Sequence, residues 1–407
     1  MENKKQIAAI KAYMQKGETP EHHFLHGAEL EYFIVDKATK KSLPFKNGIE
    51  LILKELLNYG FQPILEAEHV IGIQNEKLAI SLEPGAQWEI SLYPQTNIAT
   101  LQKVFLDFIE QLTPILQSRN QMLYSSGYLP KSTISEIEML PKKRYRFMYD
   151  YFCKTGKYAH NMMKGTASIQ VAVDYSKEED FVQKMRLASR LTPIFSAIYD
   201  NSNVFEGEEY QDFCLRTLIW NHCDEQRCGI IPQIFAVDFG YEKYAEYILN
   251  LVPILITDKK NNIVSSQRPF KDVFDLNGDI EAQLNHVFSM CFPDVRARKY
   301  LELRMTDSLP YPLNFAFIEL VYIIFYNASI FQKVHHLLEN IGLQEIQQAK
   351  LEIIQKGIQA QYVGKTILEH FSEIMELIPA DNLFQKWNQE IVETGIIPRF
   401  RKFRTAY

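Results

Sequence analysis

Four glutamates stand at spacings that suit joint binding of a cation. Glu29 and Glu31 lie two residues apart in an apolar run, and Glu83 and Glu89 stand on either side of a Pro-Gly pair. Two residues that are two apart on a β-strand share a face and lie roughly 6 to 7 Å apart at the backbone. Together with water and phosphate oxygens, such carboxylates form magnesium sites. For the first pair, a solvated edge strand is the alternative.

Two arginines extend this chemistry towards phosphate. Arg216 stands in Leu-Arg-Thr-Leu-Ile-Trp and Arg304 in Leu-Glu-Leu-Arg-Met, and both are expected on strands or beside them. A guanidinium group holds phosphate and carboxylate groups with a planar fork of donors. The glutamates and arginines together therefore suggest nucleotide phosphoryl chemistry. An arginine in so apolar a run as that of Arg216 is also commonly a paired structural residue, and this alternative stays open.

The glycine-rich nucleotide signatures are missing. Thr155-Gly156-Lys157 has Tyr151 at the position where a P-loop needs its first glycine, and no dinucleotide-binding glycine fingerprint follows a strand. We therefore expect phosphates to be held by metal and arginine rather than by a loop of backbone amides.

A hairpin carries the second pair of glutamates. Alternation along the run after Pro-Gly places Glu89 on a polar face with Gln87 and Ser91, opposite Trp88. The side taken by Glu83 is open. A strict two-residue turn would put the two glutamates on opposite faces, whereas a longer or bulged connection would bring both to one side.

Other strands must position the remaining polar residues. Residues 26–36 read as the strand of the first two glutamates, and residues 166–175 alternate so that Gln170 shares a face with other polar side chains. Near residue 302, Glu302 and Arg304 share a face in the same way. A strand with one polar face is either a surface or a site.

Composition limits the classes of function. The chain has 407 residues, 46 % of them hydrophobic, with a formal charge of −6 and a pI near 6.0, so no electrostatic footprint for nucleic acid is present. The one local basic cluster, Arg399, Arg401, Lys402 and Arg404, is interpreted as a helix end or a solvated terminus. Without an apolar signal core or a run of transmembrane length, the sequence predicts a cytoplasmic protein with no membrane partner.

The chain reads as one unit. No internal repeat, low-complexity segment or clear linker divides it, so we expect a single domain over 1–407 of α+β class. The site-forming sheet is expected at about 26–307 and a helical C-terminal part at about 310–407. Helices are expected at residues 5–16, 48–59 and 176–199, and another begins at Thr96 or Asn97 and runs to about Arg119.

Six motifs in order carry a resemblance to a known family. The motifs are Gly27-Ala-Glu-Leu-Glu-Tyr-Phe, Ser81-Leu-Glu-Pro-Gly-Ala-Gln-Trp-Glu-Ile-Ser, Pro141-Lys-Lys-Arg-Tyr, Met162-Met163 before Thr166-Ala-Ser-Ile-Gln-Val, Leu215-Arg-Thr-Leu-Ile-Trp, and Phe292-Pro-Asp-Val-Arg-Ala-Arg-Lys-Tyr-Leu-Glu-Leu-Arg. In these motifs the chain resembles the glutamate–cysteine ligases of the plant and proteobacterial type, which belong to the glutamine synthetase-like carboxylate–amine ligases. The match runs from about residue 26 to 307, and the C-terminal hundred residues match poorly.

This resemblance implies ATP-dependent formation of a γ-glutamyl amide on a curved antiparallel sheet with helices outside. The γ-carboxylate of L-glutamate would attack ATP to give γ-glutamyl phosphate, and the amine of L-cysteine would then displace the phosphate. The resemblance also implies roles for individual residues. Glu29, Glu31, Glu83 and Glu89 would ligate Mg²⁺, Arg216 and Arg304 would hold the substrate carboxylate or the moving phosphoryl group, Gln170 would assist, and Arg144, Tyr145 and Trp220 are weaker candidates for substrate binding.

One departure concerns the acceptor. After Arg304 the family usually has a glycine-rich turn with a tryptophan, whereas this chain has Thr306-Asp-Ser-Leu-Pro-Tyr-Pro. A γ-glutamyl ligase for another amino acid or amine is therefore the nearest alternative, and a non-catalytic relative that binds glutamate or nucleotide is a third. The oligomeric state is open.

Overall fold

A nine-stranded antiparallel sheet forms the centre of the residues that the computed structural model describes, 2–257 and 262–401. The strand order is β14-β15-β7-β1-β5-β4-β3-β2, and β6 pairs with the second half of β1. The expected α+β class with a large antiparallel sheet is confirmed. The strands of this sheet are β1 (His26–Asp36), β2 (Gln62–Glu66), β3 (His69–Gln74), β4 (Leu78–Leu82), β5 (Trp88–Gln95), β6 (Gln121–Tyr124), β7 (Ser168–Val173), β14 (Val295–Ala297) and β15 (Leu301–Asp307).

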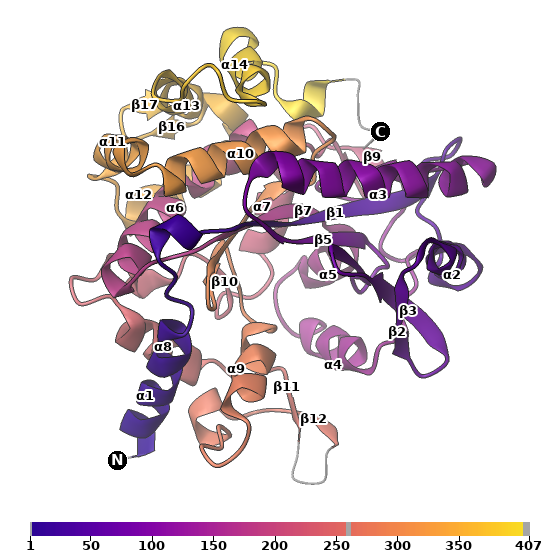
Figure 1. Ribbon diagram of the computed structural model, residues 1–407, viewed down its shortest axis with the longest axis horizontal. Helices are drawn as coiled ribbons and strands as arrows, with labels where there is room; N and C mark the ends of the chain where they lie inside the picture. The colour runs from indigo at the N-terminus through magenta and orange to yellow at the C-terminus, as the bar shows by residue number, and fades with distance from the viewer. Residues whose placement is uncertain (1, 258–261, 402–407) are drawn as a thin grey trace.

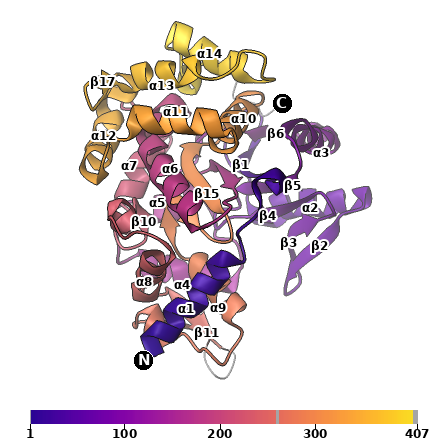
Figure 2. The ribbon, with the colours of Figure 1, turned by 60° about the vertical axis from the view of Figure 1, so that its left-hand side comes forward.

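Helices lie on both sides of the sheet. Figure 1 shows α3 and α10 above β1 and β5, and α4, α5 and α9 below them. Figures 1 and 2 both place α13 and α14 at one end of the molecule and α1 with α9 at the other. The helices before residue 310 are α1 (Glu2–Gln15), α2 (Glu50–Leu56), α3 (Ile98–Ser118), α4 (Lys143–Phe152), α5 (Ala159–Gly165), α6 (Glu178–Ile198), α7 (Leu215–Asn221), α8 (Tyr241–Asn250) and α9 (Ile280–Phe288). Short two-stranded ladders pair β8 (Val204–Phe205) with β9 (Glu208–Glu209), β10 (Cys228–Gly229) with β13 (Phe292–Pro293), and β11 (Leu255–Thr257) with β12 (Ile263–Ser265).

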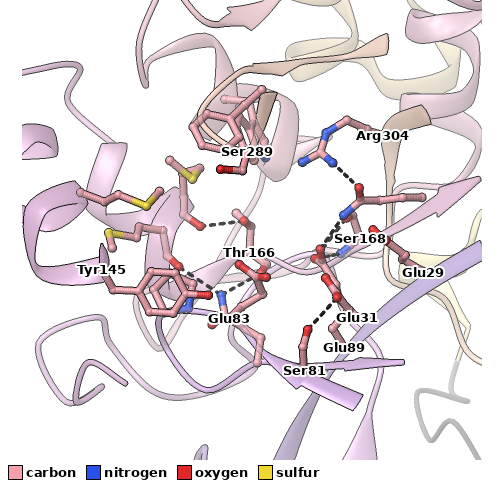
Figure 3. Close-up of a pocket in the computed structure, with 18 of the residues that line it drawn as sticks. Glu29, Glu31, Ser81, Glu83, Glu89, Tyr145, Thr166, Ser168, Ser289 and Arg304 are labelled. Atoms are coloured by element: carbon pink, nitrogen blue, oxygen red, sulfur yellow. Dashed lines mark hydrogen bonds between the residues drawn. The ribbon is translucent and has the colours of Figure 1, made fainter. Parts of the chain in front are cut away.

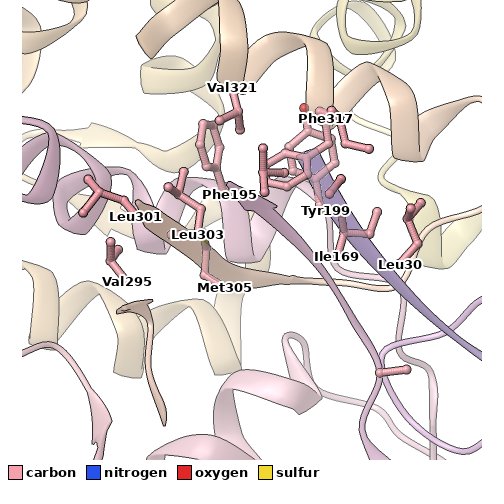
Figure 4. Packing of buried hydrophobic residues seen from close by; sticks show 14 of the residues in the cluster. Leu30, Ile169, Phe195, Tyr199, Val295, Leu301, Leu303, Met305, Phe317 and Val321 are labelled. Carbon is pink, nitrogen blue, oxygen red and sulfur yellow. The ribbon is translucent and has the colours of Figure 1, made fainter. Parts of the chain in front are cut away.

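Alternation along the strands separates a core face from a polar face. Leu30, Ile169 and Leu303 are at most 1 % exposed and point towards α6 and α10. In Figure 4, Leu303 lies beside Phe195 of α6, and Ile169 lies beside Tyr199 and beside Phe317 of α10. Burying such side chains is the main favourable contribution to folding. The residues between them on each strand face the other way, where the sheet carries its charged groups.

Local sequence signals predicted the bounds of several helices to within a few residues. The side chain of Asn97 accepts a hydrogen bond from the Thr100 amide at 2.9 Å and so caps α3, which ends one residue before Arg119. The predicted helix over 48–59 is a short α-helix continued by a 3₁₀ turn. The helix expected from Ser176 begins at Glu178 instead, because Lys177 takes the N-cap position in extended backbone and no side-chain cap is made.

The C-terminal part is mainly helical, as expected, but a small hairpin interrupts it. Its elements are α10 (Leu313–Tyr326), α11 (Ala328–Leu338), α12 (Leu343–Lys356), β16 (Gln361–Tyr362), β17 (Lys365–Thr366), α13 (Ile367–Glu376) and α14 (Gln385–Thr394). The interpretation of the basic cluster as a solvated terminus is wrong for Arg399, which is 6 % exposed and pairs with the buried Asp200. Arg401 pairs with Glu390, and Lys402 and Arg404 lie outside the described residues.

In the described ranges, no single helix is both long and apolar enough to cross a membrane. Only α10 and α11 taken together reach that length and composition, and they are bent by 93° at their junction.

Candidate active site

Strand register brings the glutamates of distant segments together. Glu31 of β1 lies directly opposite Glu89 of β5, and Glu29 lies opposite Gln170 of β7 on its other side. Directly paired residues of antiparallel strands have Cβ atoms about 4.5 to 5.5 Å apart. The pairings therefore place three carboxylates and a carboxamide on one face within reach of a common ligand.

Glu83 joins this face through a five-residue connection. The last pair of the hairpin is Leu82 with Trp88, so residues 83–87 form the loop. The Glu83 amide donates to the Gln87 carbonyl at 3.0 Å, and the Gln87 side chain accepts from the Gly85 amide at 2.8 Å. This is the longer of the two connections considered from the sequence, and it turns Glu83 to the side of Glu89.

A cavity of about 280 Å³ lies between the polar face of the sheet and helices α4, α5 and α7 (Figure 3). All ten residues proposed from the sequence line it: Glu29, Glu31, Glu83, Glu89, Arg144, Tyr145, Gln170, Arg216, Trp220 and Arg304. The sequence therefore identified residues that the fold gathers from six separate segments.

Glu31 is held rigidly. Its carboxylate accepts hydrogen bonds from the Ser168 amide at 2.7 Å, the Ser168 hydroxyl at 3.1 Å and the Gln170 Nε2 at 2.8 Å. The Gln170 Oε1 in turn accepts from Nη1 of Arg304, so one carboxamide fixes an acidic and a basic group relative to each other (Figure 3).

The ionised form of each of the other three glutamates is disfavoured in the fold, which raises their pKa values. Burial and the charge of Glu89 raise the pKa of Glu29 to about 8. Burial raises the pKa of Glu83 to about 7, with a contribution from Glu31, and burial with the charge of Glu83 raises the pKa of Glu89 to about 7. Carboxylates that repel one another in a partly desolvated site are stabilised by a bound cation.

The four glutamates suit a magnesium ion whose coordination is completed by water and substrate phosphates, rather than a metal site made by protein ligands alone. Within 2–257 and 262–401, no group of three or more His, Cys, Asp or Glu side chains already converges as a metal site. Magnesium is commonly bound by one or two carboxylates together with water and substrate phosphates. The four glutamates could hold it in that way, with the ligand completing the coordination.

Arg216 is a buried cation without a counter-ion. It is 6 % exposed, and no carboxylate of the described residues lies within 4.0 Å of its guanidinium nitrogens. The guanidinium lies 5.5 Å from the ring centroid of Trp220, and burial lowers the pKa of Arg216. Because an uncompensated buried charge is costly, this group is suited to bind an anionic ligand.

Of the two positions expected for Arg216, on a strand or beside one, the first is wrong. The residue lies in the first turn of α7, because a short apolar run bounded by loops is compatible with either a buried strand or a buried helix. Arg304 does lie on a strand, β15, where burial and the charge of Arg296 lower its pKa to about 10, so that it stays protonated.

The sequence argument missed two basic residues of the cavity, Arg296 and Arg298. Arg296 Nε donates to Glu302 at 2.5 Å, and Arg298 Nε lies 3.2 Å from the same carboxylate. Although burial raises it, the pKa of Glu302 is held at about 2 by the charges of Arg296, Arg298 and Arg304. Two arginines with strand spacing just before the Glu302 strand are the signal that could have revealed them.

Lys142 is a third basic residue that the sequence argument left without a role. It lies in the Pro-Lys-Lys-Arg-Tyr motif, lines the cavity, and has its ammonium 5.1 Å from the ring centroid of Tyr145. Burial lowers the pKa of Lys142, and the charge of Glu83 opposes this shift. The helical side of the cavity therefore carries cations, while the sheet side carries the four glutamates together with Arg296 and Arg304.

The three weaker candidates form part of the cavity wall. Arg144 donates to the Ser289 hydroxyl at 2.9 Å, and the Tyr145 hydroxyl donates to the Leu82 carbonyl at 3.1 Å. Trp220 packs against Phe292, with ring centroids 6.0 Å apart. These contacts give all three a structural role in addition to their place at the cavity.

The chain is similar in sequence to known glutamate–cysteine ligases. A model of the glutamate-cysteine ligase family 2 (GCS2) matches residues 25–397. A chloroplastic glutamate–cysteine ligase of Nicotiana tabacum is 26 % identical over 404 residues, covering 95 % of this chain and 77 % of that protein. Glutamate–cysteine ligase B of Oryza sativa subsp. japonica, also chloroplastic, is 27 % identical over 376 residues, covering 90 % and 76 %.

A solved structure is similar in fold. The glutamate–cysteine ligase of Francisella tularensis, crystallised in complex with AMP, superposes with a TM-score of 0.53 at 12 % sequence identity and covers 93 % of this chain and 83 % of that one. The family match also extends past residue 307, where the motifs ended. The six motifs could not show this, because none of them lies beyond Arg304.

Proposed function

The chain belongs to glutamate-cysteine ligase family 2, and from this premise we propose that it joins the γ-carboxylate of L-glutamate to the amine of L-cysteine with hydrolysis of ATP to ADP and phosphate. The observation that carries the proposal is the cavity itself. Repelling carboxylates on one side and the unpaired Arg216 on the other suit a metal–triphosphate and an acidic substrate held together.

Bound Mg²⁺ would neutralise the triphosphate and the transferring phosphoryl group. Glu29, Glu31, Glu83 and Glu89 would hold it, and the rigid hydrogen bonding of Glu31 would fix its place relative to the sheet. The raised pKa values of the other carboxylates mean that cation binding displaces protons from them.

Arg216 and Arg304 would stabilise the negative charge of the phosphoryl group during its transfer. In the first step an oxygen of the substrate γ-carboxylate bonds to the terminal phosphorus of ATP and ADP leaves. In the second step the amine nitrogen bonds to the carbonyl carbon, the bond from that carbon to the phosphate oxygen breaks, and phosphate leaves with the proton that the amine loses. Arg216 would bind the phosphoryl oxygens, since no carboxylate of the described residues pairs with it. Arg304, which donates a hydrogen bond to Gln170, would bind them too.

The acceptor is the less constrained part of the proposal. Met148, Met162, Met163, Phe292 and Trp220 are all among the residues that line the cavity, and such apolar and thioether groups suit contact with a small apolar or sulfur-containing side chain. This supports cysteine, the substrate named in the relatives, over a large or charged amine.

The test is ADP release with MgATP and L-glutamate, measured without acceptor, with cysteine, and with a panel of amino acids and amines, and with mass spectrometry of the product. Glu31→Gln serves as the matched control that assigns the signal to this site. The fastest ADP release with cysteine and a γ-glutamylcysteine mass would support the proposal. A faster reaction with another amine would keep the chemistry and replace the acceptor, and no reaction with any acceptor would reject the ligase activity.

The roles of the ten site residues stay predictions until such variants are measured. The same holds for the cytoplasmic location, the single-domain organisation and the absence of nucleic-acid or membrane partners.

A further inference from the structure

The turn that follows α6 contains a carboxylate that is fully buried. Asp200 is 0 % exposed, and its Oδ2 accepts from the Cys214 amide at 3.0 Å and from Arg399 Nη1 at 3.0 Å. Its Oδ1 accepts from the Ser202 amide at 3.1 Å. This one side chain therefore joins the end of α6, the start of α7 and the C-terminal segment.

Arg399 contacts the same region with its whole guanidinium group. Nη1 also donates to the Asp212 carbonyl at 2.5 Å, Nη2 donates to the Tyr210 carbonyl at 2.9 Å, and the Arg399 amide donates to the Asp200 carbonyl at 3.0 Å. A planar fork can reach a carboxylate and two carbonyls at once, whereas an ammonium group cannot match that geometry. Arg399 thus holds both ends of the segment 200–214.

The end of this segment sets the position of Arg216. Cys214 has φ 49° and ψ 48°, a left-handed conformation that is unfavourable for a residue with a side chain, and its amide is bonded to Asp200. Two residues later Arg216 points into the cavity from the first turn of α7. The conformation that starts α7 is therefore maintained by contacts that Arg399 completes.

Arg304, another of the cavity arginines, is connected to the same turn. Asp307, three residues after Arg304 on β15, accepts from the Asn201 amide at 2.8 Å and the Ser202 hydroxyl at 2.6 Å through its Oδ2. The turn 200–202 thus joins the elements that carry both arginines. Without Arg399, a buried carboxylate at its centre would lose its counter-charge, which is strongly unfavourable.

We propose that Arg399 is a positioning residue of the active site, which orients Arg216 towards the substrate phosphoryl group through Asp200 and the segment 210–214. The inference rests on the proposed function, in that Arg216 is taken to bind phosphate. It gives the C-terminal segment a part in catalysis, although that segment lies outside the cavity.

The experiment compares Arg399→Lys with Arg401→Ala as the matched control. Arg401 lies in the same segment but pairs with Glu390 of α14 instead. At a temperature well below the midpoint of thermal unfolding, we expect Arg399→Lys to lower kcat/KM for MgATP at least about tenfold, and the control to stay within about twofold of the wild type. If Arg399→Lys does not fold, Asp200→Asn carries the same test, because it keeps an oxygen acceptor for Cys214 while removing the charge.

A double-mutant cycle separates positioning from general stability. If Arg399 acts through Arg216, then Arg399→Lys should cost less than about twofold once Arg216→Ala is present. The cycle is measured on the Kd for magnesium tripolyphosphate as well as on turnover, so it does not depend on ligase activity. Effects that multiply in the double variant, or a folded Arg399→Lys protein with wild-type kcat/KM, would overturn the inference.

The tripolyphosphate measurement also distinguishes the two proposals. One outcome is a wild-type protein that ligates no amine while the two substitutions still show non-additive effects on tripolyphosphate binding. That result would reject the ligase reaction and keep the positioning role of Arg399. A wild-type protein that binds no tripolyphosphate would remove the phosphate role of Arg216 and this inference with it.

Discussion

Replacing Glu29 with glutamine should stabilise the fold while abolishing turnover. The Glu29 carboxylate has Glu89 as its main repulsive neighbour and is partly removed from water, so its charged form is disfavoured in the native state. Glutamine has nearly the same shape and no charge. The substitution therefore relieves repulsion in the free protein and removes a candidate metal ligand, so that stability and activity change in opposite directions.

The size of the stabilisation follows from linkage between ionisation and folding. In the unfolded chain the carboxyl group has a pKa of 4.5, whereas in the native state it is about 8. The raised native pKa means that stability is lost as the pH rises from 4.5 towards 8. At pH 7 the loss is at most about 3 kcal/mol at 1.36 kcal/mol per pH unit. Because the group keeps some contact with solvent, we expect Glu29→Gln to recover about 1 to 3 kcal/mol there and almost nothing near pH 4.5.

The assay is urea unfolding at pH 5, 6, 7 and 8 without divalent cations, repeated with Mg²⁺. The matched control is Glu50→Gln, since Glu50 is a buried glutamate that lies 2.8 Å from Lys54. Although burial raises it, hydrogen bonds from Lys54, Val70 and His69 bring the pKa of Glu50 below its ordinary value. Glu50→Gln should therefore destabilise the protein at neutral pH. Added Mg²⁺ should stabilise the wild type more than Glu29→Gln.

A loss of stability in Glu29→Gln that does not vary with pH would refute this reasoning, because it would show that the carboxylate is compensated in the native protein. Retained ADP release in the same variant would remove Glu29 from the metal site.

Three further predictions concern other parts of the molecule. Arg304→Lys should lower kcat at least about 100-fold with little change in the thermal midpoint, because a point charge cannot replace a fork held by Gln170; near-normal turnover would take Arg304 out of the site. The Mg²⁺ concentration for half-maximal activity should fall as pH rises from 6 to 8, since Glu83 and Glu89, each with a pKa of about 7, must lose protons to bind metal; a requirement independent of pH would contradict this. Gly127→Ala should cost about 2 to 4 kcal/mol in unfolding free energy, since a Cβ there would lie 2.2 Å from the Asp307 carboxyl group, and unchanged stability would show that this carboxyl group moves freely.

Much of the polar face of the sheet could be predicted from alternation alone. Glu29 and Glu31, Glu89, Gln170 and Arg304 lie on strands whose other face is apolar, and period two assigns each side chain to a face whatever the pairing. The capped helix after Asn97 is equally local, since a cap depends on a few neighbouring residues. The family resemblance also rested on short motifs of this kind.

Tertiary structure decided what depends on contacts between distant segments. The face on which Glu83 lies depends on the length of the loop that carries it. The position of Arg216 on a helix depends on how its apolar run is buried. Neither can be deduced from the alternation of side chains along the sequence. Arg296 acquires its role only when strand pairing sets it against Glu302.

The burial of Arg399 is the clearest case of this division. In the sequence it belongs to a basic cluster near the end of the chain, where solvation is the simplest expectation. In the fold its counter-charge is Asp200, 199 residues away, at the centre of the turn that joins the elements of Arg216 and Arg304. Residue types and spacings thus determine which groups can do the chemistry. The packing of remote segments determines which charges are compensated and which are left for a ligand, because a charge is paired or unpaired only by what the fold places beside it.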